Sequence, residues 1–439
     1  MKNNAVVIGA GLAGSEAAWQ LARRNIDVLL YEMRPAKQTP AHHTGLFAEL
    51  VCSNSLRSDE LSTGPGLLKE ELRRMHSLIM EAADTCRVPA GSAQAVNRKA
   101  FSEYITDKLR NHPCIHVMEE EFTAFDNDKV TICASGPLTS DSLFNSILKI
   151  TGEDTLYFYD AAAPIVTAES VNMDKAFWQS RYNKGDGSDY LNCPLDVKEY
   201  RNLYELLANA ERIPTHDFEK EIFFEGCMPV ETMVDRGFQT LLFGPLKPVG
   251  LVDPKSGKTP FAVVQLRKED AQGVLLNLVG FQTRTKWGDQ AKIIHAIPAL
   301  ANAEIVRYGV MHRNTFLNGP KLLTSAGQLK ANKHLFFAGQ MTGVEGYIES
   351  AASGLVCGIN AARLLKHQEV LDFPATTAIG CLLQHVSSAS PASYQPMNIN
   401  FGLMPPPAKH IRSKKERGVF YAERALSDLE EWKVQNHEG

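Results

Sequence analysis

Two of the eight cysteines have neighbours that suit chemistry. Cys52 lies among short polar residues and is soon followed by Arg57, whose positive charge would favour a thiolate. Cys227 follows a glycine and lies just before Pro229, so the chain should bend there and present the thiol instead of packing it. Because the thiolate is the reactive form of cysteine, both residues are candidates for nucleophilic or acid–base catalysis.

The remaining cysteines are predicted to fill the core: Cys86, Cys114, Cys133, Cys193, Cys357 and Cys381. No pair among the eight has CxxC or zinc-ligand spacing, so the sequence predicts no metal site. The adjacent His42 and His43 lack further ligands at metal spacing, and we interpret them as loop or cofactor-edge histidines.

A glycine-rich turn near the N-terminus predicts a dinucleotide-binding site. Its residues are Gly9, Ala10, Gly11, Leu12, Ala13 and Gly14. Gly9 permits a tight turn, Gly11 lets the backbone approach a pyrophosphate, and Gly14 lets a helix pack closely on a strand. Glu32 follows at the distance where a carboxylate can accept the ribose hydroxyls.

The elements around this turn have the order that such a site requires. An apolar run at 5–8 predicts a buried strand, residues 15–24 show helical spacing, and 27–31 predict a second strand that ends at Glu32. The helix N-terminus would direct free N–H groups and a positive dipole end toward the phosphates.

A second glycine-rich turn, late in the chain, predicts the other part of a cofactor site. Residues 333–339 predict a strand that ends in Ala-Gly, and a helix rich in small residues is predicted from about 350 to 366. The candidate cofactor contacts between them are Gly339, Gln340, Met341, Gly343, Gly346 and Tyr347. The positive end of this helix suits a reduced flavin pyrimidine, which carries negative charge. A chain with both turns resembles flavoproteins of the glutathione-reductase-like FAD fold.

Longer runs resemble one family, the folate- and FAD-dependent tRNA (uracil-5-)-methyltransferases. The matching runs are VVIGAGLAGSEAA at 6–18, ELVCSNSLRSD at 49–59, GPLTSDSL at 136–143, FFEGCMPVE at 223–231, FLNGPKLL at 316–323, FAGQMTGVEGYIESAASGL at 337–355 and YQPMNINFGL at 394–403. They occur in order over the whole chain.

The resemblance implies an enzyme with FAD as cofactor and with 5,10-methylenetetrahydrofolate and NADH or NADPH as co-substrates. The product would be 5-methyluridine at position 54, in the T loop of tRNA. The resemblance assigns to Cys227 the thiolate addition at uracil C6, and to Cys52 the removal of the C5 proton. The folate methylene would pass to C5 by way of reduced FAD, whose hydride would complete the methyl group.

The predicted fold class is α/β: a discontinuous glutathione-reductase-like Rossmann domain that binds FAD, with an inserted α/β domain. Residues 1–165 and 329–439 are assigned to the FAD-binding domain, including a C-terminal helical segment at 371–439, and residues 166–328 to the insertion. A strand-like run at 155–162 fits the third strand end of the FAD-binding domain. Within the insertion, 256–259 predicts a hairpin turn between strands at 246–252 and 261–266.

The charge balance of the chain alone would argue against a nucleic-acid partner, but a net charge averages over the whole chain, whereas tRNA would meet only one face. Lys and Arg number 46 against 50 for Asp and Glu, which gives a net charge of -4. The densest basic run, 409–417, follows three prolines and is either a solvated helix face or an edge that contacts tRNA phosphates. The chain has no apolar run of membrane-spanning length and no secretory signal, so we expect no membrane partner and a cytoplasmic location.

Three alternatives remain open from the residues. The same chemistry could act on an rRNA uridine, because a T loop and an rRNA loop demand similar local contacts. The chain could be a non-catalytic FAD-dependent RNA-binding protein, in which the surroundings of Cys227 would have no chemical purpose. It could also be a flavin oxidoreductase that acts on small molecules.

Overall fold

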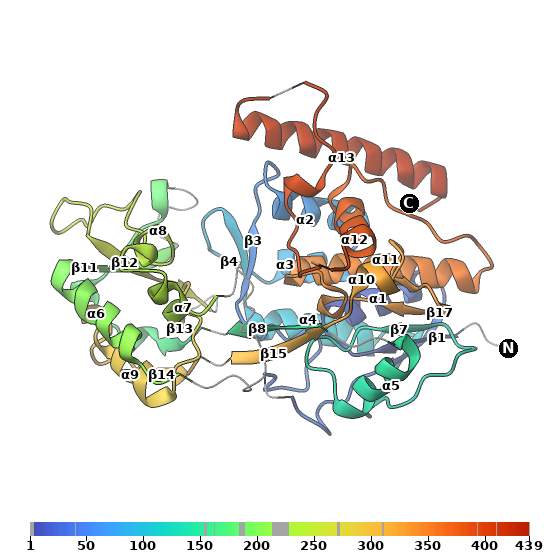
Figure 1. The fold of residues 1–439 in the computed structure, drawn as a ribbon, viewed down its shortest axis with the longest axis horizontal. Coiled ribbons are helices and arrows are strands. Elements are labelled where there is room, and N and C mark those ends of the chain that lie inside the picture. Colours follow the sequence, from blue (N-terminus) through green and yellow to red (C-terminus); the bar gives the residue numbers. More distant parts are fainter. Residues whose placement is uncertain are drawn as a thin grey trace.

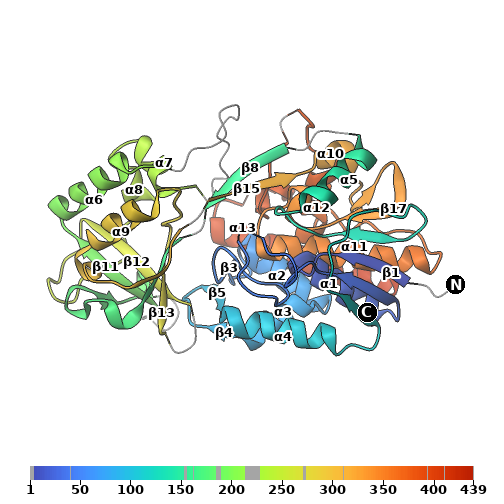
Figure 2. The same cartoon turned by 90° about the horizontal axis from the view of Figure 1, so that it is seen from below.

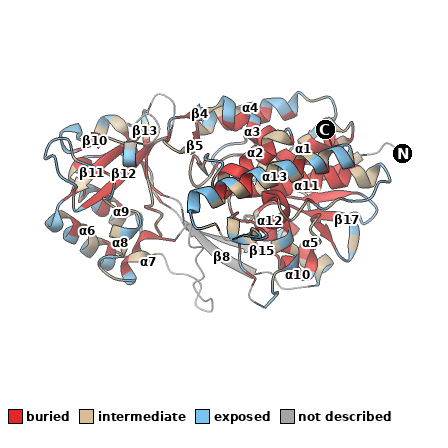
Figure 3. Cartoon of the chain, turned by 90° about the horizontal axis from the view of Figure 1, so that it is seen from above, coloured by how far each residue is buried: buried red, intermediate tan, exposed pale blue. Residues whose placement is uncertain are grey.

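The structure is a computed structural model that describes residues 4–39, 41–152, 156–161, 163–183, 189–212, 228–269, 273–309, 311–392, 394–409 and 411–438. Figure 1 shows a larger part that contains both ends of the chain, beside a smaller part formed by the middle of the sequence. Each part has its own buried core (Figure 3). No helix in the described ranges is long and apolar enough to cross a membrane.

A mostly parallel sheet forms the centre of the larger part. Its order is β16 (Gln328–Leu329), β17 (Asn332–Phe337), β7 (Thr131–Cys133), β1 (Asn4–Ile8), β2 (Asp27–Tyr31) and β6 (Ile115–Met118). All neighbours pair in parallel except β16 and β17. The predicted strands at 5–8 and 27–31 are both present. The residues at 5–8 are buried in the centre of the sheet, which their apolar side chains favour.

Two helices pack against each other beside this sheet. They are α1 (Leu12–Arg23) and α11 (Tyr347–Leu365). A Cβ atom added to Gly354 would lie 2.1 Å from the carbonyl oxygen of Ala13, so only glycine permits this approach. The contact places the N-termini of both helices at the same edge of the sheet, although they are far apart in the sequence.

An antiparallel sheet forms the centre of the smaller part. Its order is β10 (Phe177–Trp178), β11 (Tyr190–Leu195), β12 (Ala262–Lys268), β13 (Leu275–Leu278), β9 (Ile165–Thr167) and β14 (Ile305–Arg307). The helices α6 (Val197–Asn209), α7 (Val230–Asp235), α8 (Thr240–Phe243) and α9 (Trp287–His295) belong to the same part and supply apolar side chains to its core.

The described part of the run at 155–162 forms a strand, but not in the sheet where the sequence suggested it. This strand, β8 (Leu156–Ala161), pairs antiparallel with β15 (Met311–Phe316) in a separate two-stranded sheet that links the two parts (Figure 2). The position next to β1 in the parallel sheet belongs to β7 instead. An apolar run predicts a strand but not its partner, which the tertiary structure decides.

The predicted hairpin around 256–259 is also wrong in part. Residues 253–258 do form a tight turn, in which Asp253 N–H donates to Lys258 O at 3.0 Å. Residues 246–252, however, are not a strand, and the next strand, β12, begins at Ala262. Pro245 and Pro248 flank the start of this run, and a proline has no N–H to donate to a strand neighbour.

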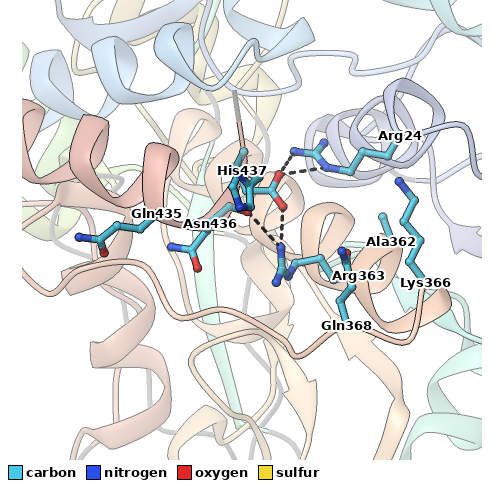
Figure 4. Close-up of a pocket in the computed structure, with 9 residues that line it drawn as sticks. Arg24, Ala362, Arg363, Lys366, Gln368, Gln435, Asn436 and His437 are labelled. Carbon is cyan, nitrogen blue, oxygen red and sulfur yellow. Dashed lines mark hydrogen bonds and ion pairs between the residues drawn. The ribbon is translucent and has the colours of Figure 1, made fainter.

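The C-terminal segment contains α12 (Ala378–Ser388) and α13 (Lys414–Asn436). The end of α13 is fastened by Glu438, whose carboxylate forms salt bridges of 2.6 Å with Arg24 and 3.1 Å with Arg363. Figure 4 shows these two arginines in a small pocket of about 270 Å³ at the far end of α1 and α11. This pocket contains none of the candidate catalytic residues and serves to anchor the tail.

Candidate active site

In the first glycine turn, the backbone atoms pack closely against one another and against β2. Gly9 has φ 91°, and its N–H donates to Tyr31 O at 2.7 Å. A Cβ atom on Gly14 would lie 1.8 Å from Gly9 O. At Gly11, by contrast, an added Cβ would meet no atom within 4 Å. Packing therefore requires two of the glycines, and the third faces open space in which a ligand can approach the backbone.

Glu32 closes this end of the site from the tip of β2. Its carboxylate accepts from Ala10 N–H at 2.9 Å and from the Arg34 guanidinium at 2.9 Å. Burial alone would raise the pKa of Glu32, but the hydrogen bonds and charge of Arg34, with the Ala10 N–H, outweigh it and lower the pKa. Glu32 thus stays an anion that can accept hydroxyl hydrogen bonds.

His42 lies beside this acid. Its Nδ1 is 2.6 Å from Thr39 Oγ1, and burial together with the charge of Arg34 lowers the pKa of His42 to about 4. The imidazole is therefore neutral at pH 7. No group of residues in the described ranges has the geometry of a metal site.

A cavity of about 440 Å³ opens at the carboxyl edge of the parallel sheet. Most of its lining comes from within residues 8–13, 31–34, 51–57, 134–140 and 339–350. The predicted residues that line it are Gly9, Gly11, Leu12, Ala13, Glu32, Cys52, Gly339, Gln340, Gly346 and Tyr347. Residues that the sequence places far apart thus meet at one cavity.

Four of the predicted contacts do not line the cavity. Ala10 and Gly14 are buried beneath the first turn, and Met341 is buried at 4% exposure. Gly343 has φ 90°, and a Cβ there would lie 2.3 Å from the hydroxyl of Tyr394. These residues shape the turns instead of facing the cavity.

The second glycine turn delivers the start of α11 to the cavity. Gly339 and Gly346 have φ values of 81° and 120°, which residues other than glycine rarely adopt. They allow the chain to turn sharply from β17 into α11, which begins at Tyr347, slightly before the predicted 350. The free N–H groups at this helix start provide a positive end at the cavity, as they do in α1.

Tyr347 connects this turn to Cys52. Its hydroxyl oxygen accepts from Cys52 N–H at 2.8 Å and from Ser53 N–H at 3.1 Å. Burial, with a smaller effect from the neighbouring Cys52, raises the pKa of Tyr347, so the phenol is neutral. The contact holds the backbone of the thiol-bearing loop against the start of α11.

Three arginines from distant parts of the chain hold the same loop from the other side. The Cys52 carbonyl accepts from Arg98 at 3.0 Å and from Arg307 at 3.3 Å. Arg267 donates to Ser53 Oγ at 2.7 Å, and Arg98 also forms a salt bridge with Glu269. Burial and the charge of Arg98 lower the pKa of Arg307 to about 10.

Sequence reasoning missed these arginines because nothing in their local sequence distinguishes them from surface cations. Arg267 and Arg307 belong to the smaller part of the molecule, and Arg98 and Cys52 to the larger part. Their convergence depends on how the two parts pack. Cys227, the other candidate catalytic residue, lies outside the described residues. The described chain resumes at Met228, and Val230 N–H donates to the carbonyl of Gln282, which lines the cavity.

The other cysteines occupy packing positions. Cys133, Cys193, Cys357 and Cys381 are buried, and Cys86 and Cys114 are partly buried. Burial raises the pKa of Cys133 to about 11, which keeps it a thiol.

The parallel sheet, the two glycine turns and the shared cavity define a dinucleotide-binding α/β protein with the glutathione-reductase-like arrangement, which confirms the predicted fold class. The family model described as Glucose inhibited division protein A matches residues 4–369. The fold is similar to that of GidA from Aquifex aeolicus, with a TM-score of 0.69 and 14% identity over 98% of this chain and 73% of that chain.

Curated relatives define the family more narrowly. A Listeria monocytogenes protein is 58% identical over 98% of both chains, and an Anoxybacillus flavithermus protein is 59% identical over 97% of this chain and 98% of its own. Both are named methylenetetrahydrofolate--tRNA-(uracil-5-)-methyltransferase TrmFO. The chain belongs to this family, which confirms the resemblance found in its sequence.

Proposed function

We propose that the chain methylates C5 of a uridine in tRNA, with methylenetetrahydrofolate as the one-carbon donor. The observation that carries this proposal is the meeting of both glycine turns and Cys52 at one cavity, with the Cys52 N–H bound to Tyr347. The names of the family members support the substrate and the donor. We further propose that the uridine is position 54 of the T loop and that NADH or NADPH is the reductant.

The residues of the cavity fit FAD. Gly11 leaves space for a pyrophosphate, the start of α1 offers N–H groups to it, and the Glu32 carboxylate is placed for ribose hydroxyls. The start of α11, with Gly346 and Tyr347, would hold the flavin ring. The chemistry supplied by a bound FAD would be hydride donation and one-carbon transfer to the uracil.

The protein groups would then act on the uracil itself. Cys227 is the proposed nucleophile: its thiolate adds to C6, which makes C5 an enolate carbon that attacks the methylene carrier. Cys52 is the proposed acceptor of the C5 proton, whose removal would break the bond between the methylene and its carrier. Once a hydride has completed the methyl group, the Cys227 thiolate would leave C6 and the C5–C6 double bond would return. Tyr347, Arg98 and Arg307 would keep the Cys52 loop in place by holding its backbone.

We retain the division into an FAD-binding domain, 1–165 and 329–439, and an inserted domain, 166–328, as a proposal. The side chains of Leu317, Leu322 and Leu323 pack in the larger core, which favours a second boundary nearer to residue 310. The predicted cytoplasmic location also stays a proposal.

The decisive experiment is incubation of the FAD-loaded protein with unmodified tRNA, methylenetetrahydrofolate and NADH or NADPH, followed by nucleoside mass spectrometry. We expect 5-methyluridine that maps to position 54. The same assay on an rRNA fragment tests the closest alternative, and product from rRNA alone would overturn the tRNA assignment. Oxygen-driven turnover without RNA would favour a small-molecule flavin oxidoreductase.

Substitution of the proposed nucleophile tests the chemistry separately from cofactor binding. Cys227→Ser should abolish 5-methyluridine formation, an effect of about 10³-fold or more, while bound FAD per chain is unchanged. Cys114→Ser, at a partly buried cysteine outside the cavity, is the matched control and should retain activity. Normal turnover by the Cys227 variant would contradict its assignment as nucleophile.

A further inference from the structure

Arg57 lies on the cavity wall in a backbone conformation that few side chains adopt. Its φ is 66°, in the left-handed region, although it is not a glycine. The conformation is held by neighbours: Arg57 N–H donates to Ser55 Oγ at 3.1 Å, and the buried Lys69 ammonium donates to Arg57 O at 3.3 Å. Such strain persists only where surrounding contacts impose it, and it is concentrated at functional sites.

The guanidinium of Arg57 is held as firmly as its backbone. It donates to Glu349 Oε1 at 2.9 Å, and the Glu349 side chain is only 2% exposed, whereas that of Arg57 is 43% exposed. One side of the guanidinium is thus fixed to a buried carboxylate, and the rest is available from the cavity. An arginine prepared in this way can receive a carboxylate or a phosphate without losing much side-chain freedom.

Two arginines are among the described residues that line the cavity, and Arg57 is the exposed one. The other arginine there, Arg34, is 2% exposed and is bound to Glu32 and Glu49. The other charged residues of the lining are acids: Glu32, Glu49, Glu120, Glu121 and Glu345. An anion that enters this cavity near Cys52 therefore has one exposed cation to meet.

Two sets of contacts connect the neighbourhood of Arg57 to the first half of α13. Along the first, a Cβ atom added to Gly418 would lie 2.3 Å from Ser62 O, so α13 lies directly on the loop after β3 (Ser55–Ser58). Along the second, Ile399 N–H donates to Glu349 Oε1, the same oxygen that accepts from Arg57. Two residues further on, the Phe401 ring stacks on the Tyr421 ring of α13, with the ring centroids 4.8 Å apart. Figure 1 shows the start of α13 above β3 and α2 (Gly64–Arg74).

The segment around the start of α13 carries a group of cations that we call the α13 cations: Lys409, Arg412, Lys414, Lys415 and Arg417. All are exposed except Arg417, which is partly exposed, and within the described ranges none forms a salt bridge. The nearby cations Lys69, Arg73 and Arg87 differ, because each is paired with Asp59. These cations outnumber the one acid among them, Glu416, so the start of α13 is mostly positive, and it is connected to the cavity wall through the loop after β3.

We propose that Arg57 and the α13 cations bind phosphates of the RNA backbone of the substrate and lead that strand into the cavity. The inference rests on the proposed RNA substrate and goes beyond it by assigning the surface. Phosphates suit these groups because arginine forms two parallel hydrogen bonds with them and lysine attracts them as a point charge. The surface leads to Arg57 at the cavity wall, so the bound strand would present its base near Cys52.

Charge reversal at the start of α13 tests the surface in a binding assay that needs no turnover. Lys414→Glu with Lys415→Glu in the FAD-loaded full-length chain should weaken binding of unmodified tRNA about tenfold or more at low salt. The slope of log affinity against log salt should become shallower by about two, because two fewer phosphates would be neutralised in the complex.

A matched control makes the same charge change on the opposite side of the molecule. Lys333 lies near the start of β17 and Lys366 follows the end of α11, so both exposed lysines lie at the amino edge of the sheet, away from the cavity. Lys333→Glu with Lys366→Glu should leave tRNA affinity within about twofold. Equal losses in both double variants, or no loss in either, would overturn the proposal.

The contribution of Arg57 is measured in the methylation assay. Arg57→Ala should raise the KM for tRNA about tenfold and leave the KM for methylenetetrahydrofolate unchanged, and Arg57→Lys should restore part of the loss. An increase confined to the folate KM would show that Arg57 binds a folate carboxylate and would overturn its assignment to RNA. If wild-type protein methylates tRNA while all these variants match it, this inference alone fails. If wild-type protein neither binds nor methylates tRNA, the proposed function fails as well.

Discussion

The two ends of the cavity are built in different ways. At the dinucleotide end, the contacts are local: Gly9 bonds to Tyr31, and Ala10 bonds to Glu32, all within one strand–helix–strand unit. At the thiol end, Cys52 is held by Tyr347, Arg98 and Arg307, which come from remote segments and from both parts of the molecule. The first end can form with its own unit, whereas the second is complete only once the smaller part has docked and supplied Arg307.

This difference predicts two kinds of defect. Damage to the dinucleotide end should remove FAD, and with it every later step. Damage to the thiol end should leave FAD bound and slow the reaction, because only the position of the Cys52 loop changes. Three substitutions test the comparison, beginning with the largest effect.

The largest effect is expected at Gly14. A methyl group there would lie 1.8 Å from Gly9 O, which is backbone and cannot move aside. Gly14→Ala should therefore destabilise the protein by about 3 kcal/mol or more and abolish FAD binding. Denaturant unfolding and the flavin absorbance per chain measure the two effects.

Gly11→Ala is the matched control within the same turn. Because no atom lies within 4 Å of the added methyl group, stability should change by less than about 0.5 kcal/mol while FAD affinity falls. Normal FAD affinity in this variant would mean that the open space at Gly11 is not where the cofactor approaches. The pair thus separates folding from binding at the dinucleotide end.

An intermediate effect is expected from Arg98→Met at the thiol end. The change removes the salt-bridge partner of Glu269, whose side chain is 5% exposed, and leaves the carbonyl oxygens of Leu50 and Cys52 without this donor. We expect a loss of about 3 kcal/mol in unfolding free energy, since a buried charge is left unpaired. Turnover should fall with FAD content unchanged.

The neighbouring Lys99 provides the control for Arg98. It pairs only with Glu103 among the described residues, and its side chain is 81% exposed, so Lys99→Met should change stability by less than about 0.5 kcal/mol. Loss of FAD from the Arg98 variant to the same extent as from Gly14→Ala would break the comparison between the two ends.

The smallest effect concerns pH at the dinucleotide end. The pKa of His42 is about 4 in the folded protein against 6.5 for a free histidine, so the folded state favours the neutral ring. Its contribution to stability is complete above pH 6.5 and is lost as the pH falls toward 4. His42 also faces Arg34, Glu32, Glu49 and His43, which are unchanged in a His42→Gln variant.

Stability of the wild type should therefore fall more steeply between pH 6.5 and 4 than that of His42→Gln. The difference should reach about 1 kcal/mol, because the ring is only partly buried and solvent reduces the charge interactions. Thermal unfolding across this pH range measures it. If the stability of both proteins changed with pH in the same way, His42 would not contribute to the pH dependence of stability.

Much of the fold and of the dinucleotide end was predictable. The turn at 9–14 and the strands on either side of it follow from local spacing, because glycine is needed wherever φ is positive or backbones touch. The second turn was found by the same reasoning, although Met341 and Gly343 turned out to support it without lining the cavity. The strand at 155–162 was predicted but its partner was not, since pairing β8 with β15 depends on a segment about 150 residues later.

The sequence by itself determined where the dinucleotide turn forms and which two cysteines are chemical candidates, because steric limits on the backbone and the surroundings of a thiol are expressed within a few residues. Only the tertiary structure decided that Tyr347, Arg98 and Arg307 meet at Cys52, and that Arg57 is pinned beside them. Those contacts join segments that come together through the packing of α11 on α1 and the docking of the smaller part. The residues next to a charged side chain in the sequence do not indicate which partner it will contact in the folded protein. The contacts at the thiol end therefore could not be predicted from the sequence.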